Sequence, residues 1–473
     1  MASAFHVENF GCRAARADGE AVAERLRASG LTEEQPSAAD VVIVNTCSVT
    51  AEADRAARAF IRRAHRLNPD ARILVTGCYA QRAPDELASL DGVAAVVGNS
   101  HKALAPEIAI RLARTPSPEP NPVPPIPAST DLIPVQTLLA GSAAETPIWV
   151  DDRFAHSFLE EAQVVPGAQT RPNLKIQEGC SNRCTFCIIP RTRGHSRSLP
   201  EESILSQVRN FAAAGGKELV LSGINLGRWG RDLPSADGAR LSLARLVHRV
   251  FDETDLPRLR LSSIEPMDWD ADLVAVIRDY SGSRLARHAH LPLQSGSDTV
   301  LRRMHRRYRP WHYAEKVASL VEAFGPGLTL GADVMVGFPG ETDREFEETC
   351  QLIRDLPFGY LHIFPFSPRP GTKGWTMHAE APVPQSVIAD RQAFLVTLVC
   401  DKTRTHRSRF VGSALDSITL HTPERLQALG RTAALTDNFL PVEIEGSQAA
   451  NRFTRIRVTG IAADLSLTAR MEA

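Results

Sequence analysis

A short loop with three cysteines near the middle of the 473-residue chain constrains its fold and chemistry most. Cys180, Cys184 and Cys187 have the spacing C-x3-C-x2-C and follow Glu178-Gly179. Three thiolates on one loop can each bind one iron of a cubic 4Fe–4S cluster and leave the fourth iron open to another molecule. One alternative is a zinc site that lacks its fourth ligand, although structural zinc ligands usually come as two pairs. The other is a chance group of structural cysteines.

Composition is that of a globular chain with two to four domains, because single cores seldom grow past about 250 residues. The formal charge of −1 gives no global case for nucleic-acid binding, so such a case depends on local arginine clusters. No apolar run approaches the roughly 18 residues of a membrane span, and the start has no basic leader or signal core. We therefore expect a cytoplasmic protein whose reduced thiols favour metal ligation over disulfides.

Strand-like and helix-like stretches alternate over residues 1–114, which predicts an open parallel α/β sheet domain. The expected strands are His6–Phe10, Val41–Asn45, Ile73–Thr76 and Val93–Val97, and the expected helices are Gly19–Ala28, Ala51–Leu67, Pro84–Leu90 and Lys102–Ala113. Cys12, Cys47 and Cys78 each come just after one of the first three strands, at the edge where open α/β sheets bind ligands. We expect them to form a second three-cysteine metal site; the alternative is three buried apolar residues.

The rest of the chain divides into three parts. Seven prolines between Pro116 and Pro127 predict a spacer over residues 115–170. Residues 171–405 predict six β/α units, which form an open (β/α)6 barrel whose site gathers at the strand carboxyl ends. The expected strands are Lys175–Gln177, Glu218–Ser222, Arg258–Ser262, Ala289–Leu293, Gly331–Val336 and Leu361–Pro365. Residues 406–473 alternate in strand fashion and predict a small β-barrel, a fold that often binds nucleic acid.

Polar residues and glycines follow several barrel strands and are candidates for ligand contacts. They are Gly223, Asn225, Glu265, Gln294 and Gly337. Any one group also fits an ordinary βα turn. Cys350 and Cys400 lie in helical patterns without a cysteine close by, so we expect them in the core.

Three arginine groups are candidate RNA contacts, because RNA binding needs charge for phosphates and aromatic surfaces for bases. The first is a helical stripe, and the other two should face the barrel mouth; a solvated helix surface is the alternative for each. The groups are Arg55, Arg58, Arg62 and Arg66; Arg191, Arg193, His195 and Arg197; and the run from Arg302 to Arg309.

Taken together, these residues resemble the radical S-adenosylmethionine methylthiotransferases over essentially the whole chain. The three-cysteine loop with Phe186 is similar to the radical-SAM signature, and the residues around Cys12, Cys47 and Cys78 match the family's second-cluster domain. Further matches are Leu291–Asp298 and Val336–Thr342, and the C-terminal barrel is similar to a TRAM domain. Within the family, the chain is most similar to the branch that acts on N6-threonylcarbamoyladenosine at tRNA position 37. The segments that carry this similarity are Asn45–Thr50, Thr76–Gln81 and Arg193–Ser198. That branch usually has Asn where this chain has Ala15, which puts the local loop geometry in question.

The resemblance implies two 4Fe–4S clusters and S-adenosylmethionine as cofactors. The cluster on Cys180, Cys184 and Cys187 would bind S-adenosylmethionine, whose one-electron cleavage gives the radical that takes hydrogen from C2 of adenine. The cluster on Cys12, Cys47 and Cys78 would hold the sulfur that is methylated and transferred. Expected cofactor contacts are Phe186, Gly223, Asn225, Glu265, Gln294 and Gly337.

The resemblance also implies the anticodon stem-loop of tRNA as partner and a monomeric, membrane-free enzyme. Sequence does not give the sulfur donor or the electron donor. Alternative activities are methylthiolation of isopentenyladenosine in tRNA or of a ribosomal protein aspartate. A protein that binds RNA through Fe–S redox sensing without catalysis is a further alternative.

Overall fold

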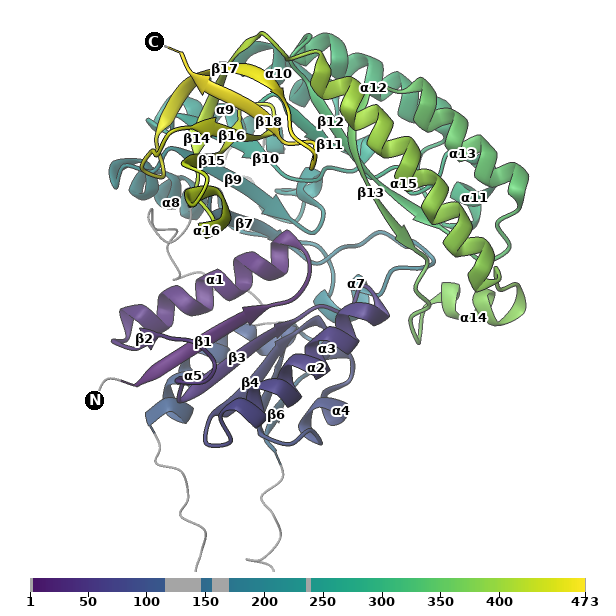
Figure 1. Cartoon of the computed structure of the whole chain (residues 1–473). Coiled ribbons are helices and arrows are strands. Elements are labelled where there is room, and N and C mark those ends of the chain that lie inside the picture. The colour runs from purple at the N-terminus through teal and green to yellow at the C-terminus, as the bar shows by residue number, and fades with distance from the viewer. Residues whose placement is uncertain (1–2, 115–145, 155–169, 235–239, 473) are drawn as a thin grey trace, which may run out of the picture. The chain divides into compact units, whose positions relative to one another are not determined.

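The computed structural model describes residues 3–114, 146–154, 170–234 and 240–472 (Figure 1). The chain divides into two compact units, of which the first is Met1–Ala162 with Arg191–Arg193 and the second is Gln163–Pro190 with Gly194–Ala473. Most of the expected proline-rich spacer, at 115–145 and 155–169, lies outside the described residues. Among the described helices, none combines the length and the apolar character that crossing a membrane requires.

The first unit is built on a six-stranded parallel sheet with the strand order β2-β1-β3-β4-β5-β6. The strands are β1 Ala4–Asn9, β2 Thr32–Glu33, β3 Val41–Thr46, β4 Arg72–Gly77, β5 Val93–Gly98 and β6 Ile148–Trp149. The four expected strands are confirmed within two residues at each end, and the short β2 and β6 extend the sheet at its two edges.

Helices cover both faces of this sheet, as expected for parallel strands. On one face α1 (Arg13–Ala28) and α5 (Ala105–Arg114) pack Leu26 and Ala109 against Ile43 and Leu74. On the other face α2 (Ala51–Leu67) packs Phe60 and its neighbours beside α3 (Cys78–Arg82) and α4 (Pro84–Ala88). Helix α2 begins where Thr50 accepts a hydrogen bond from the Ala53 amide, and its buried residues recur at helical spacing. The 3-10 helix η1 (Asn99–Leu104) precedes α5.

The second unit contains the expected open barrel of six parallel strands. They are β7 Asn173–Glu178, β9 Glu218–Gly223, β10 Arg258–Leu261, β11 His288–His290, β12 Thr329–Val336 and β13 Phe358–Pro365. Strands β7, β9 and β10 form one sheet with the short antiparallel β8 (Arg197–Ser198), and β11, β12 and β13 form another. The sheets meet at a bridge between Leu259 and Leu285 and at the hydrogen bond from the Ile264 amide to the His290 carbonyl.

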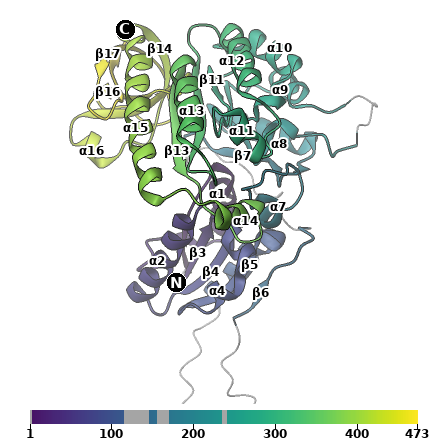
Figure 2. The same ribbon diagram turned by 90° about the vertical axis from the view of Figure 1, so that its right-hand side faces the viewer.

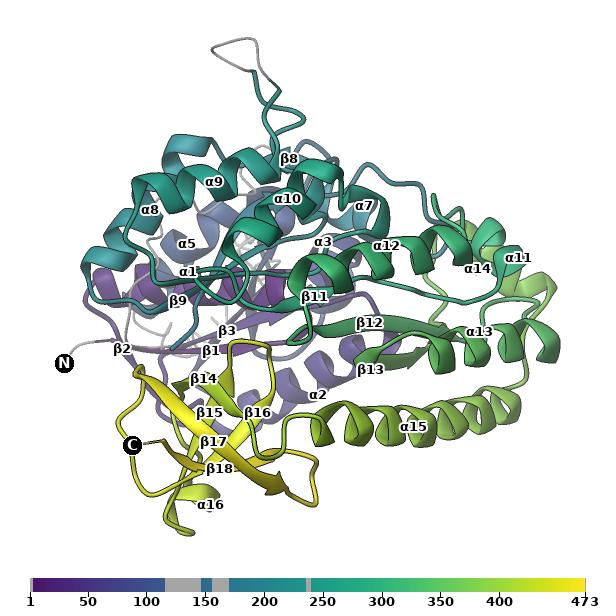
Figure 3. The same ribbon diagram turned by 90° about the horizontal axis from the view of Figure 1, so that it is seen from above.

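Helices flank the barrel strands (Figures 2 and 3). The longer ones are α8 Glu201–Ala213, α9 Leu243–Glu253, α10 Ala271–Tyr280, α12 Pro310–Phe324, α13 Asp343–Asp355 and α15 Gln385–Ser408. The shorter ones are η2 Leu226–Arg228, η3 Pro266–Asp268, α11 Asp298–Arg303 and α14 Lys373–Glu380. The segment α7 (Ile189–Arg193) follows the three-cysteine loop, and its last three residues pack as part of the first unit.

A closed five-stranded barrel ends the second unit, as the alternating pattern predicted. Its strands are β14 Ala414–Thr419, β15 Arg431–Thr436, β16 Pro441–Glu445, β17 Phe453–Ile461 and β18 Leu467–Met471, with α16 (Glu424–Gln427) between β14 and β15. The sequence did not predict β18, which closes the barrel between β16 and β17. Arg260 of β10, fully buried, donates to the carbonyls of Thr436 and Asp437 and so joins this barrel to the larger one.

Candidate functional site

The first group of cysteines lies at the carboxyl edge of the first unit's sheet. Cys12 follows β1, Cys47 follows β3 and Cys78 begins α3 directly after β4. The three strands are neighbours, and their last residues are in register, with Asn9 beside Asn45 and Thr46 beside Gly77. Parallel strands in register end at one edge, so the three cysteines are placed along this edge.

The backbone around these cysteines is tightly fitted. Gly11 has a φ of +109°, and a Cβ at this position would stand 2.3 Å from the Cβ of Cys47. Gly77 has a φ of +100°, and a Cβ there would stand 2.3 Å from the Thr46 carbonyl oxygen. Both glycines therefore allow a close approach that a side chain would prevent.

Cys47 is the cysteine of this group whose thiol is most affected by its surroundings. Burial, and then the nearby Cys12 and Cys78, raise the pKa of the Cys47 thiol to about 12. Cys47 and Cys78 are buried, whereas Cys12 is exposed. Thiols with such a pKa are protonated at neutral pH unless a metal takes the place of the proton. Three thiols that follow neighbouring strands at one sheet edge, one of them exposed, suit a metal cluster with one open position.

The second group of cysteines forms the loop after β7. The Cys180 amide donates to the Gly194 carbonyl (3.0 Å), the Asn182 amide donates to Cys180 Sγ (3.4 Å), and the Cys187 amide donates to the Cys184 carbonyl (3.2 Å). Burial, and then Cys184, raise the pKa of the Cys187 thiol to about 12, and burial also raises the pKa of Cys180. Mutual proximity of the thiols contributes to both shifts, which fits ligands of one cluster.

Two of the expected cofactor contacts, Asn225 and Gln294, have buried oxygen acceptors in the barrel that carries this loop. Asn225 is 3% exposed, and its side-chain Nδ2 lies 3.7 Å from Cys180 Sγ. Its backbone N–H donates to Gln177 Oε1. Gln294 is 7% exposed and has a φ of +64°, which is rare for a residue other than glycine. Asn225 Oδ1 and Gln294 Oε1 accept no hydrogen bond from the described residues. Buried acceptors of this kind are normally satisfied, so both amides fit polar contacts to a bound cofactor.

The other expected contacts are placed differently. The Glu265 carboxylate is engaged by Arg306, and Arg306 in turn donates to Cys184 Sγ (3.4 Å) and from Nε to the Tyr308 hydroxyl (3.2 Å). The Gly337 amide donates to Glu341 Oε2 (2.9 Å), so this N–H is already used within the loop.

The two remaining contact candidates lie closer to the loop itself. A Cβ at Gly223 would stand 2.9 Å from the Cβ of Gln177. Phe186 is partly exposed within the cysteine loop.

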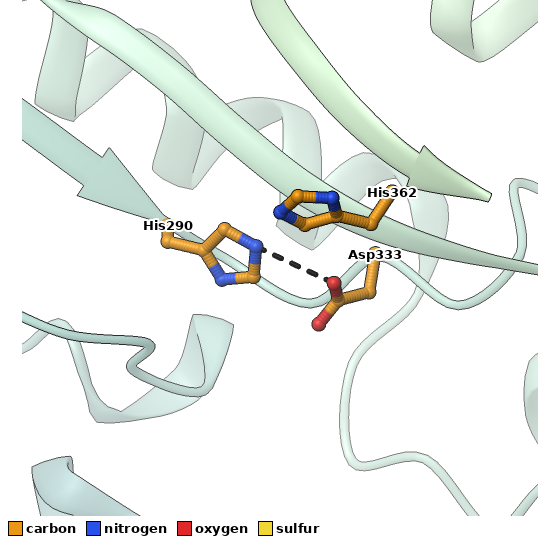
Figure 4. A group of neighbouring side chains, drawn as sticks. All are labelled: His290, Asp333 and His362. Atoms are coloured by element: carbon orange, nitrogen blue, oxygen red, sulfur yellow. Dashed lines mark ion pairs between the residues drawn. The ribbon is translucent and has the colours of Figure 1, made fainter. Parts of the chain in front are cut away.

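A polar group that the sequence reasoning missed lies on the three strands β11, β12 and β13. Figure 4 shows the side chains of His290, Asp333 and His362 turned toward one another. Their nitrogen and oxygen ligand atoms all lie within 4.8 Å of one another. His290 Nε2 is 3.4 Å from Asp333 Oδ1, and its Nδ1 is 3.0 Å from Ser263 Oγ. The period of two in His288-Ala289-His290 is a signal that could have found this group. Imidazoles with a carboxylate can bind a divalent cation or a polar part of a substrate.

The three arginine groups have different surroundings. On α2, Arg55, Arg62 and Arg66 are exposed with the neighbouring Arg63, whereas Arg58 contacts Tyr79 and Glu86. In the run from Arg302 to Arg309, carboxylates engage four arginines; the pairs are Arg302 and Arg309 with Asp298, Arg303 with Glu345, and Arg306 with Glu265. The expectation that Arg193 faces the barrel mouth is wrong, because this side chain is fully buried in the first unit.

The two isolated cysteines differ from each other. Cys350 is fully buried in α13, as expected. Cys400 is exposed on α15, so its assignment to the core is wrong. Exposed apolar residues such as Phe394 and Val396 on the same helix explain the error, because they blur the distinction between its inner and outer faces.

Comparisons with known proteins match both cysteine-bearing regions. The model of the family described as Uncharacterized protein family UPF0004 matches residues 4–98, and the model of the Radical SAM superfamily matches residues 174–353. A solved structure of the radical S-adenosylmethionine methyltransferase TsrM from Kitasatospora setae is 14% identical, with a TM-score of 0.48 over 77% of this chain and 75% of that one.

Curated relatives are similar over nearly the whole chain. The threonylcarbamoyladenosine tRNA methylthiotransferase MtaB of Bacillus subtilis is 35% identical over 94% of this chain and 90% of the relative. The MtaB of Rickettsia prowazekii is 32% identical over 96% of this chain and 94% of the relative. A tRNA-2-methylthio-N(6)-dimethylallyladenosine synthase of Bartonella tribocorum is 30% identical over 96% and 93%. Both cysteine groups lie inside the two family-model matches, and the curated relatives cover nearly the whole chain, so the chain belongs to the radical S-adenosylmethionine methylthiotransferase family.

Proposed function

We propose that the protein adds a methylthio group to C2 of N6-threonylcarbamoyladenosine at position 37 of tRNA. The observation that carries this proposal is the pair of three-cysteine groups, one at a sheet edge and one on a barrel loop, in a chain 35% identical to a relative named for this reaction. Methylation of a bound sulfur and activation of an adenine carbon are separate tasks, and two clusters with different surroundings suit them.

The cofactors of this enzyme are two 4Fe–4S clusters and S-adenosylmethionine. In the proposal, Cys12, Cys47 and Cys78 ligate one cluster within residues 1–114, and Cys180, Cys184 and Cys187 ligate the other within residues 171–405. When bound, the cofactors supply radical hydrogen abstraction and the transferred sulfur. In the same proposal, residues 406–473 form a TRAM-like barrel.

The chain's own residues bind and orient these groups. The buried oxygens of Asn225 and Gln294 would accept hydrogen bonds from donor groups of S-adenosylmethionine. At Gly223 and Gly337 the backbone packs too closely against neighbouring side chains to allow a Cβ. Phe186 lies within the loop that holds the cysteines. Glu265 acts through Arg306, which it holds beside Cys184. A site closed by these contacts keeps water from the reactive species.

The exposed arginines of α2 are our candidates for the tRNA surface. Arg55, Arg62, Arg63 and Arg66 form a basic face that the acidic first turn of the helix does not neutralise. A phosphate backbone binds to such a face without sequence specificity. The barrel arginines paired with carboxylates are weaker candidates, because part of their charge is already neutralised.

Mass spectrometry of tRNA nucleosides from a deletion strain tests the assignment. We expect 2-methylthio-N6-threonylcarbamoyladenosine to disappear and its unthiolated precursor to remain. Loss of the methylthio group from dimethylallyladenosine instead would assign the reaction named for the Bartonella tribocorum relative. Unchanged tRNA nucleosides would contradict a tRNA substrate and direct attention to a ribosomal protein.

Replacement of Cys12 by Ala separates the roles of the clusters. We expect the variant, reconstituted without oxygen, to produce 5′-deoxyadenosine on reduction and to lose thiolation of tRNA, because only the cluster in the first unit loses a ligand. Cys400→Ala is the matched control, since this exposed cysteine lies outside both groups. Iron equivalent to a single cluster in the unaltered protein, or no 5′-deoxyadenosine from it, would contradict the proposal.

A further inference from the structure

Cys78 receives two hydrogen bonds from buried side chains of the first unit. Arg193 Nε donates to Cys78 Sγ at 3.1 Å, and Asn99 Nδ2 donates to the same sulfur at 3.3 Å. Asn99 also donates to the Thr192 carbonyl at 2.8 Å, which fixes the backbone beside Arg193. Arg193 and Cys78 are 0% and 2% exposed, so water does not compete for these contacts.

Arg193 is held at this sulfur by a buried charge network. Its Nη1 donates to Asp18 Oδ2 at 3.2 Å, and the same oxygen accepts from Lys102. Lys102 is 0% and Asp18 3% exposed. Because Asp18 engages two cations, the carboxylate fixes the guanidinium in place with its Nε–H directed at the sulfur.

The chemistry of the acceptor shows which state of Cys78 this arrangement suits. A neutral thiol is a weak acceptor, whereas a thiolate takes strong, charge-assisted hydrogen bonds. A buried guanidinium is stable only where its N–H groups have good acceptors. The two donors therefore suit a Cys78 sulfur that accepts hydrogen bonds while it ligates iron.

We propose that Arg193 is a positioning residue of the cluster ligated by Cys12, Cys47 and Cys78: it orients the Cys78 thiolate and raises the reduction potential of that cluster. This inference rests on the ligands assigned under the proposed function. Hydrogen bonds to ligand sulfurs and nearby charge are among the factors that set Fe–S potentials. A cation beside the ligand stabilises the reduced, more negative cluster more than the oxidised one.

The position of Arg193 in the chain gives this contact a second consequence. It stands six residues after Cys187, and Arg191–Arg193 pack within the first unit while the cysteine loop belongs to the second. The residue that tunes one cluster is thus tied by a short piece of chain to the ligand loop of the other.

The test uses full-length protein with Cys180, Cys184 and Cys187 replaced by Ala, so that only the cluster in question remains. Redox titration followed by EPR gives its midpoint potential. We expect Arg193→Met to lower the ratio of reduced to oxidised cluster about tenfold at the parent's midpoint potential. This change corresponds to a fall of ~59 mV in the midpoint potential for one electron. Arg193→Lys keeps the charge without the Nε–H and should recover part of this shift.

Arg82→Met is the matched control, because Arg82 lies in the same unit and its guanidinium donates to Asp54 and to the Ser48 hydroxyl instead of to a sulfur. It should leave the midpoint unchanged. A full cluster with the parent's potential in Arg193→Met would overturn the inference. If this variant binds less iron, a thermal unfolding midpoint equal to the parent's supports the positioning role, and a fall beyond that of Arg82→Met overturns it. A parent without iron would instead refute the ligand assignment itself.

Discussion

Replacement of Gly337 by Ala should destabilise the barrel through one specific contact. Gly337 has a φ of +75°, and an added Cβ would stand 2.5 Å from Cγ1 and 2.7 Å from Cδ1 of Ile388 on α15. The left-handed backbone costs Ala about 1–2 kcal/mol, and overpacking of this kind costs a further ~1–3 kcal/mol. We expect the free energy of unfolding to fall by about 2–5 kcal/mol.

Gly340→Ala is the matched control in the same loop. Its φ of +71° carries the same backbone cost, but the nearest atom to an added Cβ is that of Ala381 at 3.8 Å, an ordinary contact. The difference between the two variants therefore isolates the collision with Ile388, about 1–3 kcal/mol. Urea unfolding of the full chain, followed by fluorescence of the buried Trp229 and Trp269, measures both values.

A double-mutant cycle with Ile388→Ala tests the cause directly. Ile388→Ala alone should destabilise by ~2–5 kcal/mol, because it leaves a cavity. In the Gly337→Ala background the cost should be ~1–3 kcal/mol smaller, because the methyl group then has space. Equal destabilisation by Gly337→Ala and Gly340→Ala, or a coupling energy near zero, would refute this explanation. The clash with Ile388 should also displace the loop around Gly337 and, if Gly337 lies at the cofactor, weaken binding of S-adenosylmethionine.

Two further predictions concern acid stability and RNA. Burial, and then the nearby Arg409 and Arg407, lower the pKa of His406 from 6.5 to about 4. Between these two pH values the unfolded chain binds a proton at this histidine that the folded chain does not bind. The free energy of unfolding should therefore fall by up to ~3 kcal/mol as the pH drops from about 6.5 to 4. Urea unfolding at both ends of this range should show the fall, and His406→Gln should remove it. Replacing Arg62 and Arg66 by Glu should weaken tRNA binding and flatten its dependence on salt. Filter binding at several salt concentrations should show no such change for Arg344→Glu, a residue exposed elsewhere.

Local pattern was sufficient to predict most of the elements that position the site. Helix α2 was expected at its observed bounds, because Thr50 caps it and its apolar residues recur at helical spacing. The parallel strands before Cys12, Cys47 and Cys78 were expected because each is short, apolar and followed by a glycine or polar turn. The placement of these cysteines at one edge of the sheet then followed from topology alone, since adjacent parallel strands end at one edge.

Elements with mixed patterns were not predicted. Strand β18 has only five residues, and although Leu467 and Ala469 are buried in the barrel core, so short an alternation is weak evidence for a strand until its pairing with both β16 and β17 is known. Strand β6 has only two residues and is recognisable only by its pairing with β5. Pairing of this kind is a long-range property that local sequence does not encode.

Charged side chains show the limit of sequence reasoning most clearly. Arg193 and Arg197 belong to the same basic cluster in the sequence, yet Arg193 is fully buried and Arg197 is only partly so. The partners that bury Arg193 are Asp18 and Cys78, which lie 175 and 115 residues away in the chain. A guanidinium is stable in the interior only where such partners converge, and their convergence depends on the whole sheet. The same fold that brings three cysteines to one edge therefore makes Arg193, which the sequence placed among RNA-binding arginines, a buried hydrogen-bond donor to the sulfur of Cys78.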